Sequence, residues 1–288
     1  MDYHPTGIKA QTEEEPSDKE LLRLEQQLSI IRNRYERWLR VKYRVLLKRI
    51  RAELIKKGVP TEEDITALEM YYEDQQTSIL TRFYETIYPE FGSFIMDDET
   101  AKSYAPPKLE IKRQLSLGIL AWIKETVGVH IRIINGYVPP LDDVRQMAWT
   151  SEGDPVKFKE AMDKSQMWST TGVEVRSRRI AVTETTIGMN NSMAKTSERL
   201  AMGRERIKTW HTSGLRNVRD SHRRMNGKTI NADDFYEVPV YEWVKGTGLV
   251  DTGAVDLMRY PGDHSIPPHA SNVVNCHCFV TYRYKKED

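Results

Sequence analysis

The residue types best suited to holding a metal ion lie near the end of this 288-residue chain. Cys276 and Cys278 are its only cysteines, and His222 begins an HxxxxG turn that ends at Gly227. A Cys-x-Cys pair does not easily close a disulfide on itself, because two residues of extended chain leave a short, strained ring. Thiolates and imidazoles are good zinc ligands. The sequence therefore predicts a structural zinc site, with ordinary packing of two buried thiols and a histidine as the alternative.

A fourth zinc ligand is expected from the loop that precedes the cysteines. On an extended strand Cys276 and Cys278 face one side and His277 faces the other, so His277 is a poor ligand. His264 or His269, both in the segment PGDHSIPPH, would complete the shell. Four protein ligands leave no position for water, so such a site would stabilise the fold rather than catalyse a reaction.

An enzymatic interpretation of the same residues is weaker. Cys276 or Cys278 could act as a nucleophile with His222 as its base, or His222 could work with Asp220. The chain has no phosphate-binding loop, no HExxH motif and no nucleophile elbow. We therefore predict that the protein is not an enzyme.

A basic stretch is the best candidate for contact with nucleic acid. Between Glu174 and Arg224 there are twelve Lys and Arg residues against five acidic ones. Such a concentration of positive charge can bind the phosphates of double-stranded DNA, although no interleaved aromatic residues mark a single-strand binder. The candidate contacts are Arg204, Arg206, Lys208, Arg219, Arg223 and Arg224.

The formal net charge of +1 conceals two segments of opposite charge. Residues 32–57 contain eleven Lys and Arg against two Glu, and residues 58–100 contain eleven acidic residues against one Arg. The basic run could bind DNA phosphates. We favour the alternative that it pairs with the acidic run.

The first of these segments belongs to a long amphipathic helix. Residues 1–15 have few apolar groups and are expected to be a flexible arm. Ser17 and Glu20 form a capping box, and Gly58 with Pro60 ends the helix after Lys57. At about 1.5 Å per residue it would span roughly 60 Å, so it needs a partner. Its apolar stripe is Leu24, Leu28, Ile31, Tyr35, Trp38, Val41, Val45, Leu46, Ile50 and Leu54.

The partner is predicted to be the next helix, which begins after Thr61 and ends before Pro89. The short Gly-Val-Pro-Thr connection favours an antiparallel, coiled-coil-like hairpin that lays the acidic segment against the basic one. A third helix is expected over residues 107–135.

The C-terminal part of the chain changes character. A short helix is expected around Asp142 to Trp149, a second one reaches Met167, and a polar helix covers Thr183 to Leu200. Short strand-like runs at 235–240, 241–244 and 279–284 then alternate with turns. We predict a mainly α chain: a flexible arm (1–15), an elongated helical domain (16–140), a connector (141–169) and a small α+β domain (170–288).

The overall composition is that of a protein without a membrane anchor. The chain is 39% hydrophobic and 30% charged, and no run approaches the eighteen or so apolar residues of a membrane span. The acidic beginning lacks the features of a signal peptide. Two cysteines at such close spacing give no disulfide framework, which suits a reducing compartment such as bacterial cytoplasm.

The C-terminal motifs together resemble a known family. Trp210, Arg219 with His222, Gly227 and the Asn-Cys-x-Cys of residues 275–278 stand in the same order as in the phage head morphogenesis proteins similar to the Mu F protein. Upstream, Ile180, Ala181, Thr183 and Glu184 are similar to the family's Ile-Ala-x-Thr-Glu stretch. The resemblance covers roughly residues 170–284.

This resemblance implies a function. The family's members are minor capsid proteins that attach at or near the portal inside the head, so a portal protein, other head proteins, further copies of the chain and double-stranded DNA are the expected partners. The expected location is the virion interior at the portal vertex, after assembly in the bacterial cytoplasm. Similar domains also occur in secreted toxins, so an enzyme or toxin-like effector built on the Cys/His domain is the alternative.

Overall fold

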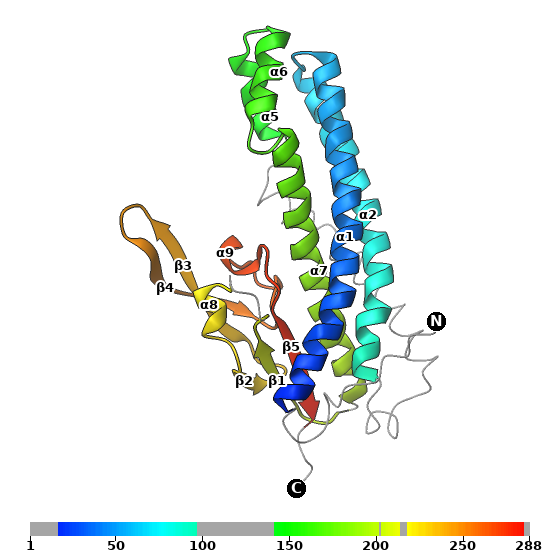
Figure 1. Ribbon diagram of the computed structural model, residues 1–288, viewed down its shortest axis with the longest axis vertical. Coiled ribbons are helices and arrows are strands. Elements are labelled where there is room, and N and C mark those ends of the chain that lie inside the picture. Colours follow the sequence, from blue (N-terminus) through cyan, green and yellow to red (C-terminus); the bar gives the residue numbers. More distant parts are fainter. Residues whose placement is uncertain (1–16, 97–140, 202, 214–217, 285–288) are drawn as a thin grey trace. The chain divides into compact units, whose positions relative to one another are not determined.

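The computed structural model describes residues 17–96, 141–201, 203–213 and 218–284 (Figure 1). They fall into two compact units that do not follow the order of the chain. Described residues 17–34, 86–96 and 182–284 belong to the first unit, and residues 35–85 and 141–181 belong to the second. The boundaries expected at 140 and 170 therefore do not coincide with the units. The predicted arm and the predicted helix at 107–135 lie outside the described residues.

Helix α1 (Asp18–Lys57) has the predicted bounds. The backbone N–H of Ser17 donates to the Glu20 carboxylate (3.0 Å), and the Glu20 N–H donates back to the Ser17 hydroxyl (3.4 Å). At the other end Gly58 has a φ of 77°, the left-handed conformation that closes helices. The capping box and the glycine stop therefore define the helix as the sequence predicts.

Helix α2 (Glu62–Met96) runs past the predicted stop at Pro89. Its start follows the prediction, because Thr61 and Asp64 form a second capping box. A proline removes one backbone donor and normally ends or kinks a helix. Here Tyr88 and Phe91 on either side of it are buried, at 2% and 0% exposure, and their packing favours continuation of the helix. Tertiary packing outweighs the local helix-breaking signal.

The second unit is helical. It combines parts of α1 and α2 with α5 (Asp142–Thr150), α6 (Pro155–Lys164) and the beginning of α7 (Thr170–Ala201). Asp154 caps α6 by accepting from the Val156 N–H at 2.8 Å. The shared core is Leu46, Leu47, Ile50, Leu54, Ile65, Tyr72, Leu141, Val144, Phe158, Met162, Trp168 and Val173.

The basic residues of α1 pair with α2, as the sequence suggests, and also with α6 and α7. Arg40 and Arg44 both contact Glu174 of α7, each at 3.3 Å. Arg51 pairs with Asp163 of α6. Ion pairs such as Lys57–Asp64 do link α1 to α2, but α6 and α7 also supply acidic partners, because the second unit packs more helices around α1 than the hairpin alone.

The first unit contains two antiparallel sheets. Strands β1 (Arg206–His211), β2 (Thr229–Asn231) and β5 (Phe279–Tyr284) form one sheet in the order β2-β1-β5. Strands β3 (Tyr236–Val244) and β4 (Gly248–Met258) form a hairpin. The short helix α8 (Asp220–Arg223) lies between β1 and β2, and the short helix α9 (Ala270–Val273) lies between β4 and β5. The predicted mainly helical chain with a small α+β C-terminal region is confirmed.

The predicted strands are right in part. The strand at 279–284 has the predicted bounds. The two runs at 235–240 and 241–244 are one strand, whose register shifts between Pro239 and Tyr241. A proline cannot donate to the ladder, which explains the irregularity at that point.

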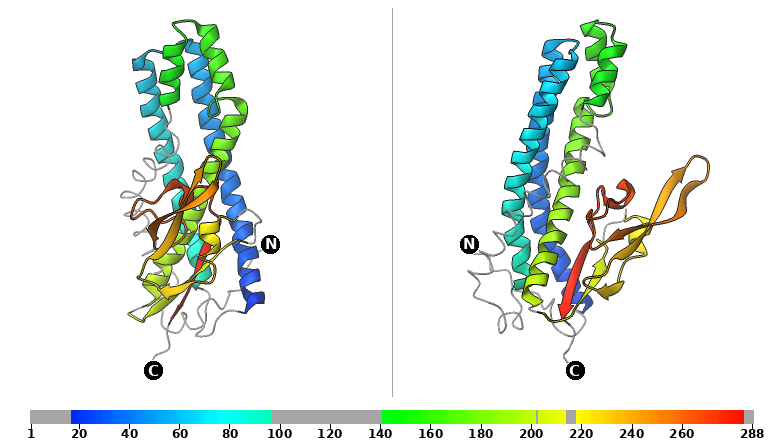
Figure 2. Two further views of the ribbon diagram at one scale, coloured as in Figure 1. Left: turned by 90° about the vertical axis from the view of Figure 1, so that its left-hand side faces the viewer. Right: turned by 180° about the vertical axis from the view of Figure 1, so that it is seen from behind.

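Helix α7 buries polar residues as well as apolar ones. The predicted helix at 183–200 is part of it, and Ile187, Met189 and Met193 are buried as expected. Thr186 and Asn190, at 1% and 0% exposure, are buried with them. Figure 2 (right) shows β5 lying beside this half of α7. Within the described part of the chain, no helix is long and apolar enough to cross a membrane.

Candidate metal centre

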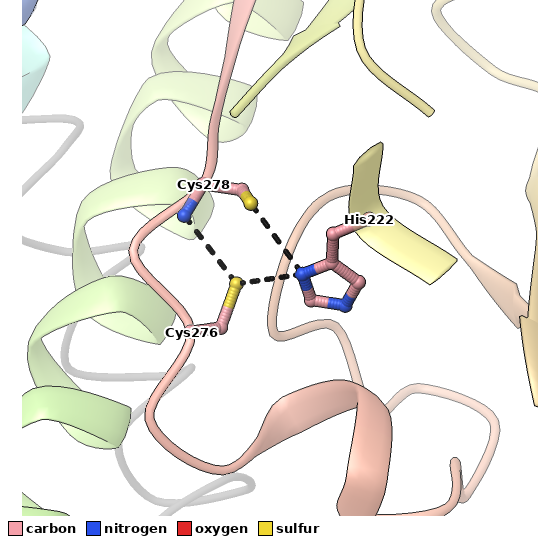
Figure 3. Close-up of side chains that lie close together, drawn as sticks. All are labelled: His222, Cys276 and Cys278. Atoms are coloured by element: carbon pink, nitrogen blue, oxygen red, sulfur yellow. Dashed lines mark hydrogen bonds between the residues drawn. The ribbon is translucent and has the colours of Figure 1, made fainter. Parts of the chain in front are cut away.

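Three separate segments bring one imidazole and two thiols together (Figure 3). His222 lies in α8, Cys276 follows α9, and Cys278 directly precedes β5. All three side chains are buried, at 2% exposure each. Their potential ligand atoms lie within 4.8 Å of one another, so the group could hold a metal ion.

The geometry of the group suits a tetrahedral metal. The Nδ1 atom of His222 lies 3.5 Å from the sulfur of Cys276 and 3.4 Å from that of Cys278. Zinc–sulfur and zinc–nitrogen bonds at tetrahedral angles place such atoms about 3.6 Å apart. The two sulfurs therefore stand at the correct distance from the imidazole nitrogen.

The second nitrogen of His222 is also placed as in metal sites. Its Nε2 atom lies 3.1 Å from the backbone carbonyl oxygen of Asn272. Metal-binding histidines usually donate their other ring N–H to a carbonyl or carboxylate, which fixes the tautomer and the ring orientation. The imidazole also packs against Trp210 in a T-shaped arrangement, with the ring centroids 5.5 Å apart. The imidazole is thus oriented with Nδ1 toward the thiols.

The two thiols differ in acidity. Burial would raise the pKa of Cys276, but the hydrogen bond from Cys278 and the nearby positive charges of His222 and Arg219 hold that pKa well below its usual range. The same hydrogen bond to Cys276, together with burial, raises the pKa of Cys278 well above its usual range. A divalent cation would favour the deprotonation of both thiols, since thiolates are the ligating form.

The segment that carries the cysteines is an irregular loop held by long side chains. Asn275 has a φ of 58°, which is uncommon for a residue other than glycine. Arg219 donates a hydrogen bond to the carbonyl of Val274, and Arg32 donates one to the carbonyl of His277 (3.1 Å). The loop is therefore fixed by contacts at both ends.

The comparisons with known proteins point to one family. Residues 157–281 match the family described as phage Mu protein F like protein. The C-terminal region of this chain is phage Mu protein F-like. This match includes every residue of the Cys/His group. No curated protein and no solved structure matches the chain.

The two histidines predicted as fourth ligands lie outside the group. Nδ1 of His269 pairs with the Asp256 carboxylate at 2.7 Å, which engages that histidine elsewhere. His264, which lies in the loop before His269, is 9% exposed and does not belong to the Cys/His group either. Among the described residues, no other His, Cys, Asp or Glu joins the three. The sequence could not predict the position of His269, because the path of its loop depends on the contact with Asp256 of β4.

The predicted nucleic-acid contacts of the phage Mu protein F-like region are mostly used inside the protein. Lys208 is 1% exposed and donates to the carbonyls of Ala232 and Asp234, so it cannot reach a phosphate. Arg206 pairs with Asp233. Alternation along β1 turns the Lys208 side chain inward, which charge counting does not detect.

Of the four remaining candidates for nucleic-acid contact, two are engaged inside the protein and two are exposed. Arg204 lies over the Tyr284 ring at 3.9 Å, and Arg219 is bonded to Val274. Arg223 and Arg224 are the exposed members, at 59% and 61%. Even these two have acidic neighbours, so the six residues do not form one basic surface.

Other residues at the centre carry no metal-ligand signal in the sequence. Thr183, which the family resemblance includes only as part of a motif, accepts a hydrogen bond from the Asn275 N–H at 3.0 Å. Asn272 links Ser221, which donates to its Oδ1 at 2.9 Å, to the buried Asp256 at 2.8 Å. The feature of the sequence that could have pointed to Asn272 is its position in the short segment before the cysteines.

Proposed function

We propose that this protein is a minor capsid protein of a bacteriophage, which associates with the portal inside the head and acts in head assembly, genome packaging or genome delivery. The match of residues 157–281 to the phage Mu protein F-like family carries this proposal. The buried Cys/His group falls within the matched region, so the proposed role and the metal centre belong to the same part of the chain.

The group at the centre is proposed to hold zinc through His222, Cys276 and Cys278. Two thiolates and an imidazole are a donor set that zinc favours, and Nδ1 already faces both sulfurs. The fourth position would be filled by water or by a group that the structure does not describe. The ion would connect α8 to the loop before β5 and so stabilise the small sheets of the first unit.

Burial supports a structural role over catalysis. A nucleophilic cysteine has to meet its substrate, and reactive cysteines are partly exposed. Cys276 and Cys278 are each 2% exposed, and His222, the base that would activate them, is also 2% exposed. A structural role does not require access from solvent. We therefore propose that the protein is not an enzyme.

One observation favours the alternative of an effector enzyme. The imidazole of His269 is 53% exposed, while the carboxylate of Asp256 that holds it is 4% exposed. An exposed imidazole oriented by a buried carboxylate is the arrangement of a general base. No nucleophile accompanies this pair among its described contacts. The structural function remains the better supported of the two.

The function is tested by coexpressing the tagged full-length chain with the portal protein of the same phage. Portal should be retained with the tagged chain after washing at moderate salt, and the chain should be detected in purified virions. A chain that retains no portal and is absent from virions would contradict the proposal. Substrate hydrolysis that disappears in His269→Ala would favour the effector instead.

A further inference from the structure

The loop that carries the two thiols is also held from its helix-facing side by α7. The Thr186 hydroxyl donates a hydrogen bond to the backbone carbonyl of Cys276. The Asn190 side-chain amide donates to the carbonyl of Cys278 at 3.0 Å. Each metal-facing cysteine therefore has its own carbonyl bonded to a side chain of α7.

The Asn190 side chain also forms hydrogen bonds with backbone groups other than the Cys278 carbonyl. Its Nδ2 also lies 3.0 Å from the carbonyl of Pro261, and its Oδ1 accepts the N–H of Val280 at 3.2 Å. The side chain is 0% exposed and so fixes the end of the cysteine loop and the start of β5 at one point. An amide in an apolar helix face would be costly without these partners.

The contacts bear directly on the geometry of the group. A hydrogen bond to a residue's carbonyl fixes its peptide plane, and the peptide planes around a residue set the direction of its Cα–Cβ bond. If Cys276 and Cys278 are held before the metal binds, less conformational entropy is lost on binding. Partners outside the ligands commonly alter metal affinity for this reason.

We propose that Thr186 and Asn190 are positioning residues that set the metal affinity of the His222, Cys276 and Cys278 group. The inference rests on the proposed metal site and extends it to α7. Neither residue offers a ligand to the ion. Each acts through the backbone of one cysteine, so helix α7 is the scaffold on which the thiol pair is preorganised.

The chain offers a matched control one residue away. Asn191 is 6% exposed, and its side chain bonds to the hydroxyls of Tyr88 and Tyr260. These contacts tie α7 to α2 and to the loop after β4 within the first unit. Replacing Asn191 by leucine therefore removes buried hydrogen bonds without touching the cysteine loop.

Two pairs of full-length variants test the inference. Thr186→Val removes the hydroxyl at nearly constant shape, whereas Thr186→Ser keeps it. Asn190→Leu removes the contacts to the loop, whereas Asn191→Leu removes contacts elsewhere. Zinc affinity would be measured by competition with a chromophoric chelator, and the ligand geometry by the absorption bands of bound Co²⁺. Thermal unfolding of the metal-free proteins would record stability separately.

Thr186→Val and Asn190→Leu should bind zinc about 10- to 100-fold more weakly than wild type, the usual effect of losing such partners. Their Co²⁺ bands should shift in position. Thr186→Ser should keep near wild-type affinity, and Asn191→Leu should lose stability but not affinity. If wild type binds zinc and all four variants bind it with the same affinity, the positioning role is contradicted and the metal site is not. Wild-type protein that binds neither Zn²⁺ nor Co²⁺ would overturn the metal site and this inference together.

Discussion

Arg32 of the first helix donates a hydrogen bond to the backbone carbonyl of His277, 245 residues further along the chain. Its side chain is buried, at 5% exposure, and it reaches the residue between the two cysteines. The first part of α1 and the cysteine loop therefore belong to one compact unit. A fragment that starts at residue 170 lacks this contact, so experiments on the metal centre require the full chain.

Replacing Arg32 by methionine should destabilise the protein. The change keeps much of the apolar length of the side chain but leaves the His277 carbonyl without its charged donor, a loss of about 1.5–3 kcal/mol for a hydrogen bond of this kind. Thermal unfolding of full-length protein measures the effect. The exposed Arg37, replaced in the same way, should change the unfolding temperature very little. Equal effects of the two substitutions would argue against a structural role for the Arg32 contact.

Charge reversal at Glu174 should destabilise the helical unit in low salt. Glu174 faces Arg40 and Arg44 at 3.3 Å, and partly exposed pairs of this kind contribute roughly 0.2–1 kcal/mol each. The effect of Glu174→Lys should shrink as salt is raised, because screening weakens both attraction and repulsion. Glu63→Lys, on the exposed face of α2, is the control. A larger loss at Glu63 would support the pairing of α1 with α2 that the sequence suggests.

Lys208 should give the protein a pH-dependent stability on the alkaline side. Burial lowers the pKa of its ammonium group to about 8, while the unfolded chain keeps the ordinary value near 10.5. Between these values the unfolded state binds more protons, so the free energy of unfolding should rise with pH, by at most about 1.4 kcal/mol per pH unit from this group.

The comparison with Lys208→Met isolates this contribution, since the tyrosines titrate in both proteins. Denaturant unfolding at several pH values from about 7 to 10, an interval that includes the folded-state pKa of about 8, gives the difference. Wild type should gain stability relative to the variant above pH 8. Parallel pH profiles would show that the buried ammonium keeps its proton, held by the carbonyls of Ala232 and Asp234.

Local signals in the sequence predicted some elements well. The capping box at Ser17 and the stop at Gly58 define α1, and a β-rich run after turn residues predicts β5. The trio of His222, Cys276 and Cys278 followed from residue chemistry alone, since few other side chains combine as zinc ligands. The structure brings these three together as expected.

Features that depend on distant packing were not predictable in this way. Pro89 stays inside α2 because its neighbours are buried, and Lys208 turns inward because alternation along β1 directs its side chain to the buried face. His269 is taken by Asp256, a residue whose position only the β3–β4 hairpin determines. The polar composition of α7 did not indicate partners, yet Thr186 and Asn190 bond to the cysteine loop from elsewhere in the chain.

The metal content of the full-length protein tests the central claim most directly. Protein purified without chelators should contain about one zinc ion per chain, because the three ligands form a single site. The double variant Cys276→Ser with Cys278→Ser should contain none, and chelation should lower the unfolding temperature of wild type but not of the variant. Wild-type protein that contains no zinc by elemental analysis, and whose unfolding temperature is unchanged by added zinc, would contradict the account.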